Sequence, residues 1–274
     1  MRLRSCRLWP SFPQKSRSIY RLGSYDSQDV VRGLEAHIRL TADLISDFPL
    51  LIVHLGVIPQ AESQDLALEN CVKNLKKVLP LAEDLGVTIC LENVPAYMPG
   101  AGFSAIGSDY HDLLTILRAC KSHYLKICYD WGHANAMGRM NYESDKKRYS
   151  LDYLKKMRYH HELIDCLAPE IVYTHLHYNS AHLELDKMLR KEGGAVWDMH
   201  WGINRISDKK TAEEYKKIVQ KVAENTALLK YGGKILLELV PKWAGPLLNS
   251  PGIGADKKDA LESVKILRRW LNQS

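Results

Sequence analysis

Five short apolar segments recur along the chain and constrain its fold more than any other feature. Each is a continuous run rich in Val, Ile and Leu rather than an alternation of apolar and polar residues. Continuous apolar character is typical of parallel strands that are covered on both faces. We therefore predict strands at FPLLIVHLG (48–56), VTICLENV (87–94), YLKICYDWGH (124–133), EIVYTHLHY (170–178) and GKILLELVP (233–241).

Segments with helical periodicity separate these predicted strands. Apolar residues recur at helical spacing in 27–46, 61–85, 109–122, 150–167, 211–230 and 257–271. In the second of these segments, Pro80 predicts a kink and Gly86 predicts the end of the helix. Alternating strands and helices are typical of repeated βαβ units. A chain of 274 residues is long enough for one α/β barrel or two ordinary domains, and no low-complexity linker divides it.

The composition indicates an ordinary soluble protein. Hydrophobic residues make up 46% of the chain and charged residues 26%, and no run of about 18 apolar residues predicts a membrane span. Six cysteines are scattered without a CxxC pair, and Cys90 and Cys128 lie inside apolar segments. We interpret the cysteines as reduced core residues and expect a cytoplasmic protein without disulfides.

The net charge of +6 allows a nucleic acid or a sugar phosphate as partner without requiring either. Much of this charge comes from residues 1–21, which contain six basic residues and no acidic residue. Such a start is typical of a transit peptide or of a disordered tail, and we favour a disordered or misassigned start. We expect residues 1–16 to form a poorly ordered basic tail and residues 17–274 to form the folded domain.

Side chains that can bind a metal lie at or near the carboxyl end of every predicted strand. The five residues, one per strand, are His54, Glu92, Asp130, His175 and Glu238. A parallel β/α barrel gathers these strand ends around one mouth, where active sites form. The regular placement therefore predicts both a barrel and a shared site.

Three of these side chains are carboxylates, and with His175 they form a typical ligand set for a divalent cation. Glu92, Asp130 and Glu238 would repel one another in a half-buried site without a cation. Oxygen-rich ligation with one imidazole suits Mn²⁺, Mg²⁺, Co²⁺ or Zn²⁺, and we expect no organic cofactor. The alternative is that each carboxylate pairs with a local Lys or Arg, which is a weaker explanation for the whole set.

A second group of candidate ligands lies in WDMHWGIN (197–204). Asp198 and His200 are two residues apart, so their side chains share a face of an extended segment. With His133 they form a three-ligand set of the kind that zinc prefers. The alternative is an Asp–His pair at a loop surface.

Other polar residues receive supporting or surface roles. His177 shares a face with His175, and we assign His177 and Asn93 to supporting the metal ligands or contacting the substrate. The charged stretch 145–158, with His160 and His161 after it, predicts a solvated helix face.

Six motifs follow one another over roughly residues 20–241: LIVHLG, CLENV, YDWGHAN, THLHYN, DMH and LLELV. In this order they resemble the xylose isomerase-like TIM-barrel superfamily, which includes endonuclease IV and many sugar or sugar-phosphate isomerases and epimerases. The resemblance implies a β/α barrel with one metal held by Glu92, Asp130, His175 and Glu238. It also implies that His133, Asp198 and His200 bind a further zinc, as in the endonuclease branch, or contact the substrate.

The chain departs from this superfamily near its beginning. His54 corresponds to the histidine of an HPG-like motif, although Leu55 replaces the usual proline. The endonuclease branch carries another histidine at the end of an earlier strand, and residues 16–27 contain none. Members also have two or three strand–helix units before the HPG-like motif, whereas only 53 residues precede His54 here. We therefore expect a barrel that is incomplete at its N-terminus, with one or two units missing or divergent.

Three functions are compatible with these features. The leading hypothesis is a metal-dependent sugar or sugar-phosphate isomerase or epimerase, in which Glu92 and Glu238 transfer a proton through an enediolate. The first alternative is endonuclease IV-like, zinc-dependent phosphodiester hydrolysis at abasic DNA, supported by the Asp198–His200 pair and the net charge. The second is a metal-binding but catalytically impaired barrel, whose exposed strand edges either another chain, as in a homo-oligomer, or the N-terminal arm covers. DNA is a partner only under the first alternative, and no membrane partner is expected.

Overall fold

The computed structural model of the chain describes residues 22–23, 28–45, 47–59, 63–95, 103–135, 158–179, 200–239 and 255–272. The chain divides into two compact units, Met1–Val94 with Gly102–Cys128, and Pro95–Ala101 with Tyr129–Ser274. The tail predicted for residues 1–16 lies outside the described residues. The division into this tail and a single folded domain over 17–274 therefore stays a prediction.

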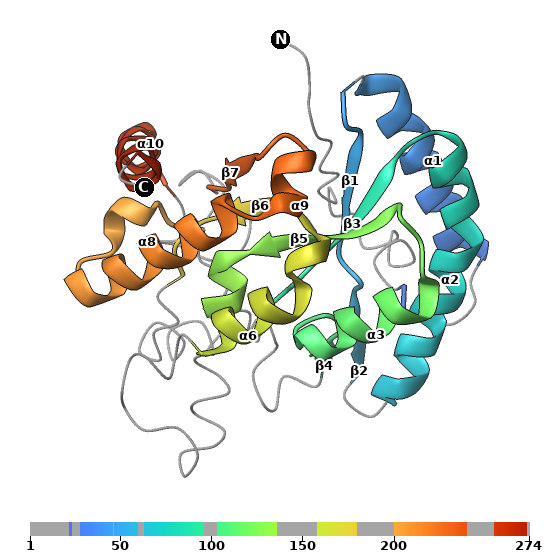
Figure 1. Cartoon of the computed structure of the whole chain (residues 1–274). Coiled ribbons are helices and arrows are strands. Elements are labelled where there is room, and N and C mark those ends of the chain that lie inside the picture. The colour runs from blue at the N-terminus through green and yellow to red at the C-terminus, as the bar shows by residue number, and fades with distance from the viewer. Residues whose placement is uncertain are drawn as a thin grey trace. The chain divides into compact units, whose positions relative to one another are not determined.

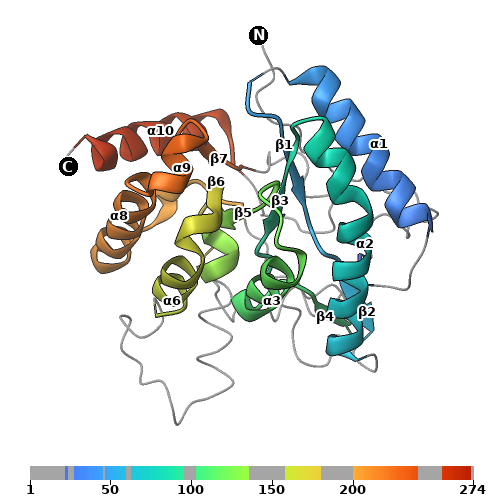
Figure 2. The ribbon, with the colours of Figure 1, turned by 45° about the vertical axis from the view of Figure 1, so that its right-hand side comes forward.

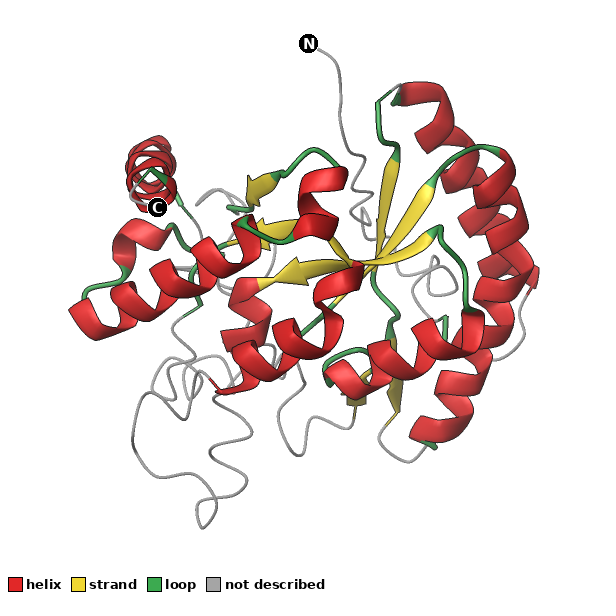
Figure 3. Ribbon diagram, in the orientation of Figure 1, coloured by secondary structure: helices red, strands yellow, loops and turns green. Residues whose placement is uncertain are grey.

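The first unit alternates strands with helices (Figures 1 and 3). Its described elements are α1 (Gln28–Leu44), β1 (Leu50–Val53), β2 (Val57–Pro59), α2 (Gln64–Asp84), β3 (Thr88–Glu92), β4 (Phe103–Ala105), α3 (Tyr110–Cys120) and most of β5 (Leu125–Asp130). The helices and main strands lie inside the segments that the apolar pattern predicts, which confirms the strand–helix order for this unit.

Strands β1, β3 and β5 run parallel. Leu50 of β1 lies beside Thr88 of β3, and Ile89 of β3 lies beside Leu125 of β5. Every residue of β1 and β3 is buried, in agreement with their continuous apolar sequences. Because the strands are parallel, their carboxyl ends meet at one edge of the sheet, where Glu92 is the last residue of β3.

Helices α1 and α2 pack side by side (Figures 1 and 2). α2 begins after Ser63, whose hydroxyl accepts a hydrogen bond from the backbone N–H of Leu66, and it continues through Pro80. Gly86 follows the helix with a φ of +65°, a left-handed conformation that glycine adopts without strain. The predicted helix end is therefore confirmed.

A small antiparallel pair, β2 with β4, has no counterpart among the predicted strands. Val57 lies opposite Ala105, and Pro59 lies opposite Phe103. Each strand has three residues, which is too short for a periodic pattern to identify.

The second unit contains the end of β5 and eight further elements whose bounds follow. These are α6 (Arg158–Leu167), the 3₁₀ turns η1 (Ala168–Glu170) and η3 (Ile203–Arg205), β6 (Ile171–Leu176), α8 (Lys209–Ala223), α9 (Thr226–Lys230) and β7 (Ile235–Leu237), followed by α10 (Lys257–Leu271). β6 is buried throughout and pairs in parallel with β7, so that Thr174 lies beside Ile235.

The single helix predicted at 211–230 is instead two helices, α8 and α9. The side chain of Asn225 accepts a hydrogen bond from the backbone N–H of Ala227 at 2.9 Å and so caps α9. The amide of Asn225 also donates to the carbonyl of Ala168 at 2.7 Å. An asparagine that starts a new helix and binds a distant segment interrupts the helix despite the apolar periodicity.

The cysteines of the described segments are free thiols: Cys71, Cys90, Cys120, Cys128 and Cys166. Burial raises the pKa of Cys71 and Cys90 far above the usual thiol value, so both are unreactive core residues. Across the described part of the chain, no helix is both long enough and apolar enough to cross a membrane.

Candidate metal centre

The sequence DWGH forms a tight turn at the end of β5. Asp130 ends the strand, and residues 131–135 are helical. The Oδ1 atom of Asp130 accepts a hydrogen bond from the backbone N–H of His133 at 2.7 Å, which caps the start of this helical turn. The Nδ1 atom of His133 lies 3.5 Å from the same oxygen. One carboxylate thus orients both the backbone and the imidazole that follow it.

Asp130, His175 and Glu238 come together in the second unit. His175 is fully buried on β6, and its Nδ1 lies 3.0 Å from Oε2 of Glu238 and 3.9 Å from Oδ2 of Asp130. Glu238 directly follows β7, where its backbone N–H donates to the carbonyl of Leu176 at 3.1 Å. Parallel pairing of β6 with β7 therefore places the glutamate beside the histidine.

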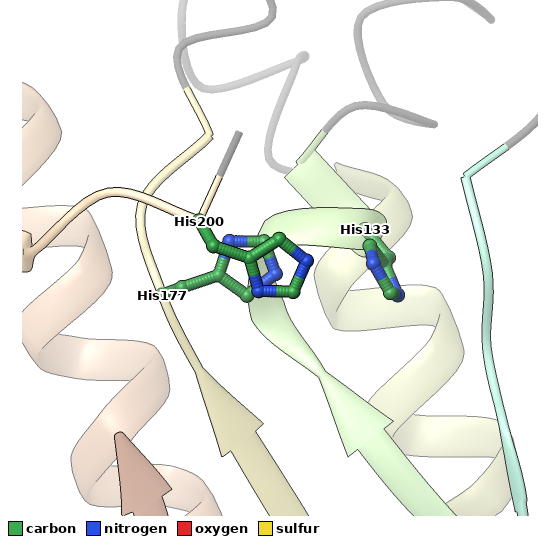
Figure 4. A group of neighbouring side chains, drawn as sticks. All are labelled: His133, His177 and His200. Carbon is green, nitrogen blue, oxygen red and sulfur yellow. The ribbon is translucent and has the colours of Figure 1, made fainter. Parts of the chain in front are cut away.

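His177 and His200 lie next to this group. The Nε2 atom of His177 is 3.0 Å from Oδ1 of Asp130, and the Nδ1 atom of His200 is 3.9 Å from Oε2 of Glu238. The His177 and His200 rings are stacked with centroids 4.0 Å apart, as Figure 4 shows. His177 is thus in direct contact with one predicted metal ligand.

Glu92 and His54 form a pair in the first unit. Glu92 is fully buried, and its Oε2 lies 3.0 Å from Nε2 of His54. The His54 side chain is 42% exposed, so the imidazole connects a buried carboxylate with the surface. Asn93, the next residue after Glu92, is buried. The two units thus hold separate parts of the predicted ligand set, and the membership of Glu92 in a common site stays a prediction.

The prediction that His160 is solvated is wrong, and the prediction for Asp198 is untested. His160 is fully buried rather than solvated, and its Nδ1 lies 2.6 Å from the hydroxyl of Tyr129. Burial lowers the pKa of His160 to about 3, so the imidazole that shares this hydrogen bond with Tyr129 is neutral in the folded protein. The spacing of His160 with Leu163 and Leu167 could have placed it on the buried helix face. Asp198 lies outside the described residues.

The donor set in the second unit fits a divalent cation. Asp130 and His175 are fully buried, and Glu238 is 9% exposed, so two carboxylates share one imidazole with little solvent. Burial of two neighbouring carboxylates is costly unless positive charge compensates them. Two carboxylates and one imidazole provide the mixed oxygen and nitrogen ligation that Mn²⁺, Mg²⁺, Co²⁺ and Zn²⁺ accept.

Strand–helix alternation, parallel pairing and ligands at strand ends together define a β/α-barrel type of protein with a candidate metal centre. The sequence matches the profile of the xylose isomerase-like TIM barrels over residues 16–201. The chain belongs to that family, and the predicted fold class is confirmed.

Solved structures share this fold at low sequence identity. A D-tagatose 3-epimerase-like protein matches with a TM-score of 0.60 and 22% identity, over 93% of this chain and 74% of that chain. An L-ribulose 3-epimerase matches with a TM-score of 0.56 and 18% identity, over 93% and 72% of the two chains. An uncharacterized protein of Methanocaldococcus jannaschii is 34% identical over 94 residues, which are 34% of this chain and 30% of that protein.

Proposed function

We propose that this chain is a metal-dependent sugar or sugar-phosphate isomerase or epimerase. The observation that carries this proposal is the buried group of Asp130, His175 and Glu238, with the His175 ring 3.0 Å from Glu238. Family membership supports it, and two structures of the same fold are described as sugar 3-epimerases or epimerase-like. The partner is then a small sugar or sugar phosphate.

The proposed metal ligands are Asp130, His175 and Glu238, completed by Glu92. The inclusion of Glu92 is supported by its position as the last residue of β3, because a β/α barrel gathers such strand ends at its mouth. A divalent cation held by these residues supplies Lewis acidity that polarises a carbonyl group and an adjacent hydroxyl group.

The two glutamates carry the proton transfer in this proposal. One of Glu92 and Glu238 removes the proton from the carbon beside the carbonyl, and a carboxylate returns it to give the isomerised or epimerised sugar. General bases of this kind contribute about 10²–10⁴-fold to a rate. His54 contacts Glu92 and is partly exposed, so it can orient that carboxylate and relay its proton towards solvent. Burial of Asp130 and His175 keeps competing water away from the ligands.

Exchange of carbon-bound hydrogen tests this function directly. The protein is stripped of metal, reloaded with Mn²⁺ and incubated in D₂O with a panel of free and phosphorylated ketoses. We expect deuterium in the product at the carbon beside the carbonyl. Glu238→Gln and Glu92→Gln should each lower the exchange about 10²-fold or more at saturating Mn²⁺. The control Glu262→Gln changes an exposed residue paired with Lys265 and should leave exchange unchanged.

Two results would contradict the proposal. Deuterium exchange at the wild-type rate by metal-bound Glu238→Gln would contradict the proposed role of Glu238 in proton transfer. Absence of exchange with every ketose, together with nicking of an abasic-site duplex, would instead support the phosphodiesterase alternative. The observation that favours this alternative is the proximity of three further imidazoles, His133, His177 and His200, because multi-metal hydrolases need additional ligands.

A further inference from the structure

Two adjacent residues of the first unit connect the carboxyl ends of β1 and β3. The backbone N–H of Ile106 donates to the carbonyl of Gly56, which lies just after β1, at 3.0 Å. The carbonyl of Gly107 accepts a hydrogen bond from the backbone N–H of Val94, which lies just after β3, at 3.3 Å. Ile106 and Gly107, which we call the bridging segment, therefore hold the two strand ends at a fixed spacing.

The bridging segment lies close to the pair of His54 and Glu92. His54 directly follows β1, and Glu92 is the last residue of β3. Oε2 of Glu92 lies 3.0 Å from Nε2 of His54, and the glutamate is fully buried. Each member of the pair stands two positions before a residue that is hydrogen-bonded to the bridging segment. The segment therefore restricts the backbone from which both side chains project.

Glycine in the bridging segment permits tight packing against both strand ends. Gly107 has a φ of +84°, which glycine adopts without strain. A Cβ atom there would lie 3.1 Å from a side-chain carbon of Leu55 and 3.7 Å from the carbonyl oxygen of Glu92. Leu55 is the neighbour of His54 in the sequence. The bridging segment therefore packs against the chain next to both members of the pair.

Asp112 anchors the bridging segment to two helices. Its Oδ2 atom accepts hydrogen bonds from the backbone N–H of Gly107 at 3.0 Å and from the side-chain amide of Gln64 at 2.8 Å. Asp112 lies in the first turn of α3, and Gln64 is the first residue of α2. Asp112 is buried, and burial raises the pKa of its carboxyl group while the hydrogen bond from Gly107 lowers it. A buried carboxylate oxygen with two donors is held in one position, because the loss of either donor would leave it poorly compensated.

We infer that Asp112 is a positioning residue, which orients Glu92 towards His54 through the bridging segment. Its importance for turnover rests on the proposed function, in which Glu92 or Glu238 removes the proton. A reacting group displaced by about 1 Å can lower a rate about 10²-fold. A carboxylate at the start of α3 can therefore control turnover, because it sets where Glu92 lies.

Amide hydrogen exchange tests the anchor without any sugar. In the wild type we expect the amides of Gly107 and Val94 to be protected, because both donate hydrogen bonds. Asp112→Ala removes the acceptor of Gly107, so exchange at Gly107 and Val94 should become about tenfold faster or more. The amide of Ile89 in β3, which donates to the carbonyl of Tyr124, should keep its rate. A general loss of stability would instead accelerate all three amides.

The reactivity of His54 reports on the pair itself. Diethylpyrocarbonate acylates imidazole nitrogens, and peptide mass spectrometry measures the rate at each histidine. The His54 side chain is 42% exposed, and His123, which is exposed in the same unit, serves as the reference. In Asp112→Ala the bond between His54 and Glu92 should loosen, so His54 should react about three- to tenfold faster relative to His123.

Matched variants separate the anchor from general effects at the start of α3. Asp112→Asn keeps an oxygen that can accept from Gly107, and it should stay close to wild type in both measurements. Gln64→Ala removes one donor and keeps the carboxylate, so it should raise both rates by a smaller factor. The control Asp109→Asn removes a neighbouring negative charge, keeps an oxygen that caps α3, and should change neither rate.

Turnover connects the anchor with the proposed function. With Mn²⁺ and a ketose that the wild type exchanges, Asp112→Ala should lower kcat about 10–10²-fold and leave KM unchanged, because Glu92 is displaced while the sugar still binds. Asp112→Asn should recover most of kcat. A purely structural role of Asp112 would lower the amount of folded protein without altering kcat per folded molecule.

Three results would overturn the inference. Unprotected amides at Gly107 and Val94 in the wild type would do so even if Asp112→Ala fails to fold, which circular dichroism detects. Unchanged His54 reactivity in folded Asp112→Ala, or wild-type kcat in that variant, would do so as well. If the wild type exchanges no ketose, the proposed function fails, and the amide and imidazole measurements still decide the positioning role.

Discussion

The buried pair of Tyr129 and His160 predicts an acid sensitivity of the fold that can be calculated. Burial lowers the pKa of His160 from its usual 6.5 to about 3, so the folded protein holds this imidazole neutral. In the unfolded chain, the same imidazole binds a proton as the pH falls through 6.5. Between these two values the unfolded state binds more protons, so the free energy of unfolding decreases as the pH falls.

The size of this effect follows from the two pKa values. Each pH unit between 6.5 and about 3 costs about 1.4 kcal/mol, which gives about 5 kcal/mol over the full interval. From pH 6.5 to pH 4.5 the expected loss is about 3 kcal/mol. This is a large share of the 5–15 kcal/mol that stabilises typical proteins.

His160→Gln isolates the contribution of the imidazole. Glutamine stays neutral at every pH in this range, and its amide oxygen can accept the hydrogen bond of the Tyr129 hydroxyl. At pH 7 we expect the variant to be about 1–2 kcal/mol less stable, because its hydrogen bond and packing are less favourable. Since the variant lacks the titration, the two unfolding free energies should cross about one to two pH units below 6.5.

Denaturant unfolding at several pH values between 7 and 4.5 measures this difference, since titrations shared by both proteins cancel. The ring protons of His160 in an NMR titration provide a direct check, because they should show no protonation above pH 4.5. A constant difference between wild type and variant across this range would refute the assignment of His160 as a buried neutral imidazole.

Two other predictions concern side-chain hydrogen bonds, one at the start of α10 and one between α2 and Leu22. Asp259 accepts hydrogen bonds from Arg205 and, in the capping box of α10, from the backbone N–H of the N-cap Asp256. The Arg205 hydrogen bond is the leading cause that holds the pKa of Asp259 well below its usual value. Asp259→Asn should therefore lower the free energy of unfolding at pH 7 by about 1–2 kcal/mol, with the difference lost as the pH falls below about 4; an equal difference at pH 7 and pH 3 would contradict this. The side-chain amide of Asn74 donates to the carbonyl of Leu22 at 3.0 Å. Asn74→Ala should therefore lower the free energy of unfolding by about 1 kcal/mol and speed amide hydrogen exchange around Leu22. Unchanged exchange would contradict a role of this hydrogen bond in holding Leu22.

The main strands and part of the candidate metal centre could be predicted because both follow simple rules. Buried parallel strands need continuous apolar residues, and their carboxyl ends meet at one edge, which places His175 and Glu238 together. The short β2–β4 pair and the break at Asn225 depend on local hydrogen bonds instead. Such contacts leave no periodic signal in the sequence.

The position of two histidines illustrates what sequence patterns miss. His160 follows a charged stretch, but its own helix turns it into the core, where a tyrosine hydroxyl satisfies its ring nitrogen. The sequence predicts that His177 supports the metal ligands or contacts the substrate, but it does not indicate the stacking of His177 on His200, which is more distant in the sequence. This contact depends on the pairing of Tyr178 with Trp201, which joins positions that no local spacing rule connects.

That pairing has an evolutionary corollary. Reciprocal backbone hydrogen bonds between Tyr178 and Trp201 hold His177 and His200 side by side. Their alignment therefore does not depend on how many residues lie between positions 178 and 201. Long connections lengthen at small entropic cost, with each doubling adding about 0.6 kcal/mol. Insertions, deletions or replacements between the two bridged residues can therefore arise during evolution while His177 and His200 stay side by side.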